Sequence, residues 1–173
     1  MSLSMYDLSV PPMVRAFGVL SAYLDKAAAF AQETGTSPQA LLTARLAPDM
    51  LTLTGQIQRA SDKSKNGVAR LTLVEAPPFA DDEASFEELK ARIAKTSDFL
   101  QSIDKSRFED SARRVIDLKF RSIGGKFHGE TYLTGILLPD FYFHVSTAHA
   151  ILRHNGVQIG KLDYLGSIRP DAQ

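Results

Sequence analysis

The stretch that decides the fold is Pro139-Asp-Phe-Tyr-Phe-His144-Val-Ser-Thr-Ala-His149-Ala-Ile-Leu-Arg-His154-Asn-Gly156. Its apolar residues recur three and four positions apart, which predicts the second half of a long amphipathic helix, from about Glu130 to Arg153. Asn155-Gly156 is a typical helix end. The apolar stripe of this helix consists of Leu133, Leu137, Phe141, Ala148, Ile151 and Leu152. Because such a stripe is buried against other helices, the chain is expected to form a helical bundle.

This helix also carries three of the four histidines, and their spacing matters for any metal site. His144, His149 and His154 are five residues apart, and at about 100° of rotation per residue they point in three directions. They therefore do not share one metal ion. Asp140 and His144 are four residues apart and project from one face, which is the apolar face. Because burying an unpaired acid or imidazole is costly, this pair is expected to be hydrogen-bonded, liganded or functional.

Three more helices with apolar stripes are predicted upstream of this one. They run from Pro12 to about Glu33, from Ala47 to about Leu73, and from the capping box Ser85-Phe-Glu-Glu88 to about Ile103. We expect Ser9 to be the N-cap of the first helix and Gly35 to end it.

A short segment before the last helix has the two-residue period of a strand rather than a helical period. Within residues 114–128, Ile116, Leu118 and Phe120 alternate with charged side chains. Gly124-Gly125 is suited to a tight turn, after which the chain returns. The segment predicts a small β-hairpin that packs on the helices.

These elements predict an all-α protein: a four-helix bundle with a small β-hairpin between the third and fourth helices, in one domain spanning residues 1–173. The long connections permit up-down-down-up order as readily as up-down-up-down order. Pro139 inside the fourth helix removes a backbone hydrogen bond, so a bend is expected there. Asp62, Lys63 and Lys65 point away from the stripe of the second helix and are expected to face solvent.

The composition narrows the classes of function. Lys plus Arg and Asp plus Glu number 20 each, for a formal net charge of zero, so no positive excess indicates nucleic acid or an anionic membrane as partner. The absence of cysteine excludes disulfides, thiolate metal sites and a cysteine nucleophile. The N-terminus lacks the pattern of a signal peptide, and no apolar run approaches the roughly 20 residues that span a bilayer. A cytoplasmic protein is therefore expected.

The second helix offers a further candidate for a site in the bundle. Asp49 lies near the apolar face of that helix, so if the second and fourth helices are neighbours it converges with Asp140 and His144. Two carboxylates and one imidazole suit a divalent first-row metal. The residues expected to line this pocket are Leu53, Gln56 and Phe141. Two other interpretations weigh about equally: Asp49 stabilises the start of its helix, and Asp140 with His144 is simply a hydrogen-bonded pair.

Several motifs give the chain a family resemblance over nearly its whole length. They are Met5-Tyr6-Asp7, Val10-Pro11, Leu46-Ala-Pro-Asp49-Met50, Leu138-Pro-Asp-Phe-Tyr-Phe-His144, Ala150-Ile-Leu-Arg-His-Asn-Gly156 and Tyr164-Leu-Gly166. With them the chain resembles the DinB/YfiT-like superfamily of four-helix bundles, and within it a bacterial family of unknown function. The resemblance favours the up-down-down-up order.

In that superfamily three histidines typically bind a divalent metal: one early on the second helix, and two as H-x-x-x-H on the last. The ending Leu152-Arg153-His-Asn-Gly156-Val157 matches the superfamily ending Leu-Arg-x-x-Gly-Val. Counting back from it places His144 on the second histidine and Asp140 on the first, and Asp49 falls near the ligand of the second helix. One histidine is thus kept, and two positions carry aspartate.

The resemblance implies two alternative functions. The first is a metal-dependent hydrolase, or a transferase of a thiol or similar small group, in which Asp49, Asp140 and His144 hold Zn, Ni, Mn or Fe. The second is a non-catalytic bundle that has lost the metal and acts as a small-molecule-binding or stress-related protein. In either case a homodimer is expected, with no nucleic acid or membrane partner.

Overall fold

The computed structural model of the chain describes residues 3–119 and 124–166. Four long helices form the body of the protein: α1 (Met5–Thr34), α3 (Leu53–Thr72), α4 (Phe86–Ser102) and α6 (Leu138–His154). The shorter elements are α2 (Pro38–Leu42), the 3₁₀ turn η1 (Lys105–Phe108), β1 (Val115–Lys119), β2 (Gly124–His128), α5 (Gly129–Tyr132), the π-helical turn η2 (Leu133–Leu137) and α7 (Lys161–Leu165).

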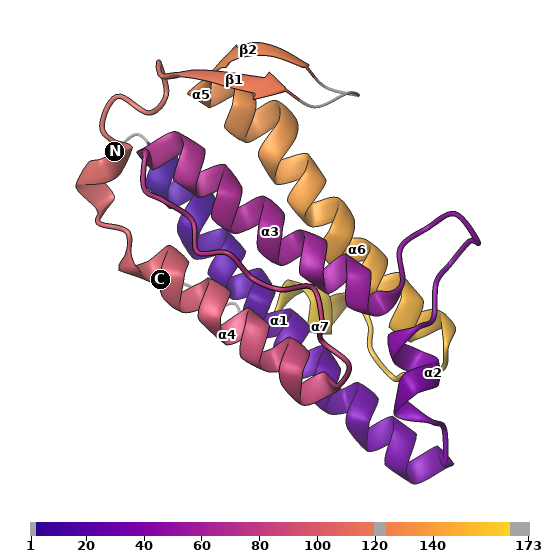
Figure 1. Ribbon diagram of the computed structural model, residues 1–173. Helices are drawn as coiled ribbons and strands as arrows, with labels where there is room; N and C mark the ends of the chain where they lie inside the picture. Colours follow the sequence, from indigo (N-terminus) through magenta and orange to yellow (C-terminus); the bar gives the residue numbers. More distant parts are fainter. Residues whose placement is uncertain (1–2, 120–123, 167–173) are drawn as a thin grey trace.

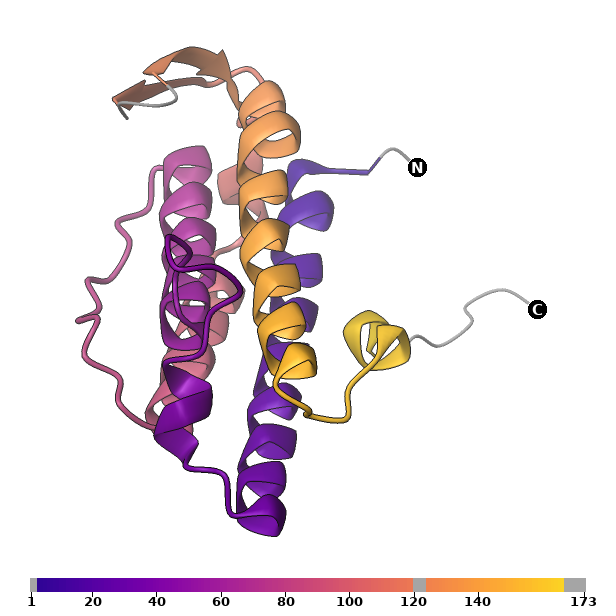
Figure 2. The ribbon, with the colours of Figure 1, turned by 90° about the vertical axis from the view of Figure 1, so that its right-hand side faces the viewer.

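The four long helices pack in the order α1, α4, α3, α6 around the bundle, so that α1 and α3 lie diagonally opposite each other. Figures 1 and 2 show α1 and α6 running in one direction and α3 and α4 in the other. This is the up-down-down-up order, and the predicted four-helix bundle with a small hairpin before its last helix is confirmed. The largest fully buried side chains are Met13, Phe17, Leu20, Tyr23, Leu24, Leu41, Leu42, Leu53, Ile57, Leu71, Leu89 and Phe141.

The first helix begins two turns earlier than predicted. Ser4 is its N-cap: the Ser4 hydroxyl accepts from the Asp7 backbone N–H at 3.1 Å, and the Asp7 carboxylate accepts from the Ser4 backbone N–H at 3.2 Å. The prediction that Ser9 caps this helix is therefore wrong. Ser9 is buried inside the helix, where its hydroxyl donates to the Met5 carbonyl at 2.6 Å. Gly35 ends the helix in the left-handed conformation, as expected.

The second long helix begins later than the predicted start at Ala47. Helix α3 begins at Leu53, and its N-cap is Thr52, whose hydroxyl accepts from the Gly55 backbone N–H at 3.1 Å. Residues 47–51 are a loop. Pro48 and Asp49 resemble a helix start, but the side chain that accepts from a free backbone N–H of this helix is that of Thr52.

The hairpin lies at one end of the bundle, beyond α5 (Figure 1). Its strands are antiparallel, with Lys119 opposite Gly124 and Leu118 opposite Gly125. The prediction that Gly124-Gly125 forms the turn is wrong, because both glycines belong to β2. The predicted strand residue Phe120 falls outside the described residues. Strand β1 buries Ile116 and Leu118 and exposes the alternate residues Val115, Asp117 and Lys119, as its alternation predicted.

The last helix is continuous from α5 through η2 to α6, and its middle turn is wider than an α-helical turn. The N–H of Leu138 donates to the carbonyl of Leu133, five residues back. Pro139 follows directly, and a proline has no N–H to continue the four-residue ladder. The π-helical turn thus lies where the proline interrupts the regular hydrogen-bond ladder of the helix.

Helices α3 and η2 approach each other closely because Gly67 has no side chain. A Cβ atom added at Gly67 would lie 2.3 Å from Leu137 Cδ1 and 2.5 Å from Leu137 Cδ2. Leu137 is itself buried, and its side chain would have to shift to admit such an atom. The glycine therefore sets the distance between α3 and the helix that carries Asp140 and His144.

A second tight constraint is a buried charge cluster that joins α3, α4 and the connection between them. The guanidinium of Arg92 on α4 contacts Asp62 of α3 at 2.8 Å. Its other amino group contacts Glu83 at 2.9 Å and Asp81 at 3.0 Å, both in the connection. Because Arg92 is fully buried, its charge depends on these carboxylates, together with the Ala80 carbonyl and the ring of Phe79, rather than on water.

Lys65 and Gln58, both on α3, complete this cluster. Lys65 contacts Asp62 at 3.2 Å and lies over the ring of Phe79. The prediction that Lys65 faces solvent is therefore wrong: it is 4% exposed. Burial alone would raise the pKa of Glu83, but hydrogen bonds from Gln58 and Arg92 outweigh it and hold that pKa below its usual value.

We expect Gly67→Ala to lower the free energy of unfolding by about 1–3 kcal/mol, because the added methyl group overpacks the contact with Leu137. Gly18→Ala is the matched control: it also lies in a helix, but a Cβ there meets nothing within 4 Å. The control should be neutral or stabilising, by up to about 1 kcal/mol. Urea denaturation of the two variants checks this, and equal effects would contradict the role of Gly67.

We expect Arg92→Ala to lower the free energy of unfolding by about 3–5 kcal/mol, because it leaves buried carboxylates without their counter-charge. Lys90→Ala, on the same helix, removes an exposed ion pair with Asp25 and should cost less than about 1 kcal/mol. Thermal and urea unfolding of both variants give the comparison. A loss of similar size in the two variants would show that the buried cluster is not a main source of stability.

Candidate functional site

Asp140 and His144 form the pair that the sequence predicted. On α6 they lie one turn apart, with His144 Nε2 3.3 Å from Asp140 Oδ1. His144 is buried, at 8% exposure, whereas the Asp140 side chain is 31% exposed. The pair thus reaches from the core of the bundle to its surface along one face of α6.

Gln56 of α3 fixes the other side of the histidine ring. Its Oε1 lies 2.7 Å from His144 Nδ1, and its Nε2 donates to the Leu51 carbonyl at 3.2 Å. Because the amide nitrogen is engaged with a carbonyl, the amide oxygen accepts from His144 Nδ1–H. The remaining ring nitrogen, Nε2, therefore faces Asp140.

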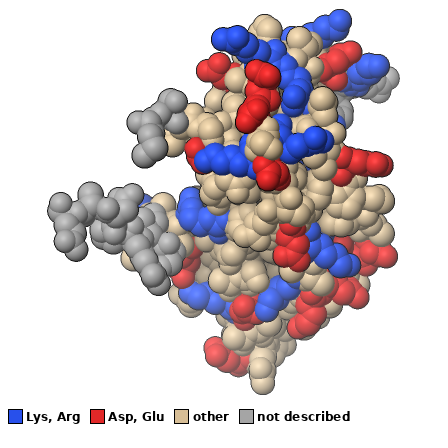
Figure 3. All heavy atoms as spheres, turned by 90° about the vertical axis from the view of Figure 1, so that its left-hand side faces the viewer, with Lys and Arg blue, Asp and Glu red and all other residues tan. Residues whose placement is uncertain are grey.

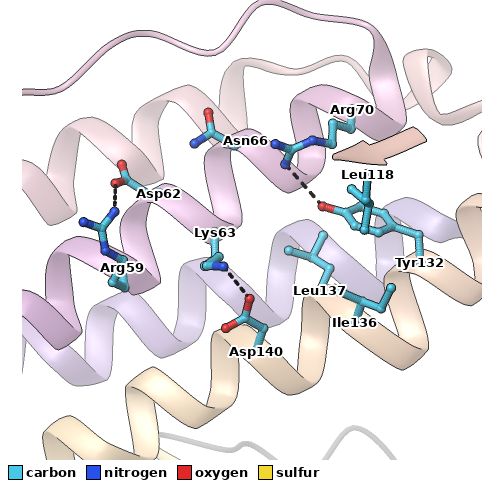
Figure 4. Close-up of a pocket in the computed structure, with 10 residues that line it drawn as sticks. All are labelled: Arg59, Asp62, Lys63, Asn66, Arg70, Leu118, Tyr132, Ile136, Leu137 and Asp140. Carbon is cyan, nitrogen blue, oxygen red and sulfur yellow. Dashed lines mark hydrogen bonds and ion pairs between the residues drawn. The ribbon is translucent and has the colours of Figure 1, made fainter. Parts of the chain in front are cut away.

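Lys63 of α3 supplies the positive charge beside Asp140. Its ammonium lies 2.8 Å from Asp140 Oδ2 (Figure 4). His144 faces the other carboxylate oxygen, Oδ1. The hydrogen bond from His144 lowers the pKa of Asp140 most, burial opposes it, and the hydrogen bond and charge of Lys63 lower it further. The net pKa lies below the usual aspartate value, so Asp140 is ionised at neutral pH.

The third predicted ligand is not part of this network. Asp49 lies in the loop before α3 and is exposed to solvent. Gln56, expected to line the pocket, contacts His144 directly, whereas Leu53 and Phe141 are fully buried in the core. Within residues 3–119 and 124–166, no group of three or more His, Asp or Glu side chains is placed to hold a metal ion.

The residues around Asp140 do not fit a three-ligand metal centre in this arrangement. One carboxylate and one imidazole nitrogen face each other, the neighbouring group on α3 is an amide, and the cation next to the carboxylate is an ammonium. Metal binding by Asp49, Asp140 and His144 stays a prediction, which would require the loop carrying Asp49 and the Lys63 side chain to move.

A cavity of about 320 Å³ opens beside Asp140, between α3 and the last helix (Figure 4). The α3 residues that line it recur at helical spacing, and the hairpin contributes one apolar side chain. Its lining residues are Arg59, Asp62, Lys63, Asn66, Arg70, Leu118, Tyr132, Ile136, Leu137 and Asp140. Arg70 Nη1 lies 3.4 Å from the hydroxyl of Tyr132.

The spacing of polar residues on α3 is a sequence signal for this cavity. Arg59, Lys63, Asn66 and Arg70 are spaced four, three and four residues apart, so they share one face of α3. Of these four residues, only Lys63 belongs to the group that the sequence predicts to face solvent, away from the apolar stripe. Its position opposite Asp140 follows from the packing of α3 against α6, which local periodicity does not encode.

The other histidines lie apart from this site. His149 Nδ1 is hydrogen-bonded to the buried Tyr23 hydroxyl at 2.7 Å, and its ring contacts that of Tyr164 on α7. Burial lowers the pKa of His149 and raises that of Tyr23, which fits a neutral ring and a protonated phenol. His128 and His154 are exposed.

Comparison with known proteins now places the chain in a class. The chain is similar to a solved structure described as a DinB family member protein from Shewanella denitrificans, at 38% identity and a TM-score of 0.92. The match covers 98% of this chain and 96% of that one. The fold is thus that of a DinB-like helical bundle.

More specifically, the model of a family described as a domain of unknown function, DUF1993, matches residues 5–165. The chain belongs to this family, as its sequence motifs had indicated. No curated protein matches the chain.

We expect the contribution of Asp140 to stability to depend on pH. Its folded pKa is lowered, so the stabilisation is present above the unfolded value of about 3.9 and is lost as pH falls through the lower folded value. Asp140→Asn should therefore be less stable than wild type at pH 7, and the difference should shrink below about pH 4.

Urea denaturation from pH 7 to pH 2.5 measures this difference. Asp82→Asn, which changes an exposed carboxylate in the connection between α3 and α4, serves as the control and should have little effect at any pH. A difference between wild type and Asp140→Asn that stays constant down to pH 2.5 would contradict the ionised pair.

Proposed function

We propose that the protein is a non-catalytic binding protein that accommodates a small molecule in the cavity between α3 and the last helix and does not require a metal ion. The observation that carries the proposal is the ammonium of Lys63, 2.8 Å from Asp140. It provides, from within the chain, the positive charge that a bound metal would otherwise bring to this carboxylate.

The charges around Asp140 disfavour a second cation. A divalent ion near the carboxylate would lie within a few ångströms of the Lys63 ammonium, and like charges at about 4 Å repel by roughly 4 kcal/mol per pair of unit charges at the effective dielectric of a protein surface. The carboxylate is further engaged by His144, whose other nitrogen is bonded to Gln56. The network is thus complete without a metal.

The cavity has the properties of a ligand site. Its volume of about 320 Å³ is at the lower end of the range of small-molecule pockets, roughly 300–1,000 Å³. Three apolar side chains line it together with seven polar or charged ones, so it is more polar than most such pockets, and its polar groups can fix the orientation of a ligand. A small ligand could therefore bury most of its surface here.

A second candidate is the metal-dependent hydrolase or transferase of a thiol or similar small group. One observation favours it: Gln56 holds His144 Nδ1, so Nε2 is the ring nitrogen that faces Asp140. Metal-binding histidines are commonly oriented by such a partner on the other nitrogen. Zn, Ni, Mn or Fe would then be held by Asp140 and His144, after Lys63 had moved aside.

Metal titration distinguishes the two functions. We expect chelator-treated wild-type protein to bind no stoichiometric Zn, Ni, Mn or Fe by elemental analysis, and to show no rise in melting temperature with these metals. A stoichiometric metal that is lost in both Asp140→Ala and His144→Ala would overturn the proposal in favour of the metal enzyme. His154→Ala, an exposed histidine on the same helix, is the control.

The surface adds two observations on partners. Figure 3 shows basic and acidic side chains interspersed over one face of the molecule, without a large patch of a single sign. Among the described residues, no helix combines the length and the apolar character needed to cross a bilayer. The homodimer and the cytoplasmic location expected from the sequence stay predictions, and the oligomeric state is checked by analytical ultracentrifugation.

A further inference from the structure

We propose that the ligand of this cavity is a small neutral molecule with a carboxamide group, which is recognised by the side chains of Asn66 and Tyr132. The inference rests on the proposed function and adds to it the chemical class of the ligand.

Two of the three cations that line the cavity are paired with carboxylates of the protein. Arg59 contacts Asp62 at 3.2 Å and Asp81 at 3.5 Å. The ammonium of Lys63 lies 2.8 Å from Asp140. An anionic ligand would therefore have to compete with carboxylates that are held on neighbouring turns of the bundle.

The two carboxylates of the cavity are each held from a second side as well. Asp62 contacts the buried cations Arg92 and Lys65, at 2.8 Å and 3.2 Å. His144 Nε2 lies 3.3 Å from Asp140. A cationic ligand would therefore compete for carboxylate oxygens that are already in use.

Arg70, the third cation, lies among groups of both signs. Its Nη1 is 3.4 Å from the hydroxyl of Tyr132, and the smaller cavity beside it is bordered by Asp117 and Lys119. Neither Arg70 nor Lys63 is a free cation. A charged ligand would lose hydration on entering the cavity without meeting an unpaired counter-charge among the described residues that line it. The cavity therefore favours a neutral ligand.

Asn66 is a neutral group in the same wall whose hydrogen-bonding capacity is unused. It is half-buried and lies on the face of α3 that carries Lys63 and Arg70 (Figure 4). Within residues 3–119 and 124–166 its side-chain amide forms no hydrogen bond. Because an amide has an acceptor oxygen and a donor nitrogen, its complement is a group that both donates and accepts.

The hydroxyl of Tyr132 supplies a second donor. The side chain is buried, and its oxygen accepts from Arg70, whereas its hydrogen has no acceptor among the described residues. Burial raises the pKa of this phenol more than the charge of Arg70 lowers it, so the hydroxyl keeps its hydrogen at neutral pH. A buried donor without an acceptor is destabilising, and a carbonyl oxygen of a ligand would remove that cost.

A carboxamide matches the two residues together. Its oxygen has two lone pairs, which suit the Asn66 amide and the Tyr132 hydroxyl, and its nitrogen can donate to the Asn66 oxygen. A short hydrocarbon part suits the apolar side chains of the cavity, Leu118, Ile136 and Leu137. The volume of about 320 Å³ favours a short-chain amide over a nucleotide-sized molecule.

The test is a titration with four probes of similar shape, observed by NMR of the methyl groups of Leu118, Ile136 and Leu137. The neutral pair is 4-methylpentanamide and 5-methylhexan-2-one, a ketone with a methyl group in place of the amide nitrogen. The charged pair is 4-methylpentanoate and 4-methylpentan-1-amine. We expect the amide to shift these signals in a saturable way. It should bind about fivefold more tightly than the ketone, the size of one hydrogen bond, and at least about tenfold more tightly than either ion.

Variants then test the two residues. Asn66→Leu should abolish the preference for the amide over the ketone, because leucine has a similar shape and no polar group. Tyr132→Phe should weaken both neutral probes, since both lose the same donor. Gln101→Leu, which changes an exposed amide on α4, is the control and should leave all affinities unchanged. The melting temperature of each variant shows whether it is folded.

Two results would overturn the residue assignments. A preference for the amide that survives in folded Asn66→Leu would exclude Asn66, and unchanged binding in folded Tyr132→Phe would exclude Tyr132. The probe series uses the wild-type protein, so it decides the class of the ligand even where a variant does not fold.

The outcomes with wild type separate the two proposals. If the ketone, the anion or the amine binds in the cavity as tightly as the amide, the inference fails and the proposed small-molecule function stands. If none of the four probes shifts the methyl signals of the cavity at millimolar concentration, the proposed function fails together with the inference.

Discussion

The close approach of α3 to the π-helical turn, which Gly67 permits, is the contact on which the arrangement of the site depends. Helices with ordinary side chains at their contact pack with axes about 8–10 Å apart, and small residues allow shorter distances. Leu137 occupies the space that a side chain at Gly67 would need. Only with α3 this close can Gln56 and Lys63 reach the histidine and the aspartate on the facing helix.

The same geometry explains why charged groups on α3 have two different environments. Asp62 and Lys65 face α4 and the buried Arg92, where each charge is paired in a confined cluster. Lys63 faces α6 and the cavity, next to a carboxylate that is partly exposed. One helix thus contributes both to a largely buried network and to a more accessible one, and Asp62 borders both because it also lines the cavity.

The sequence predicted the bundle, the hairpin and the Asp140–His144 pair because all three follow from local periodicity. It also placed Gln56 near the pair. It could not place Asp49, since a proline followed by an aspartate resembles a helix start, while the hydrogen bond from Thr52 decides where α3 begins. It also missed Lys63 as the partner of Asp140. This contact depends on the rotation of α3 against α6, which is set by side-chain packing between distant segments.

The π-helical turn has a further consequence, which concerns chain length. A π-helical turn holds about one residue more than an α-helical turn, so η2 can be regarded as a regular helix with one additional residue. Removing a residue from this turn would restore the regular ladder but would rotate all that follows by about 100° relative to the hairpin. Asp140 and His144 would then turn away from α3. In this chain, the length of the segment before Pro139 therefore fixes the direction in which the last helix presents its polar pair.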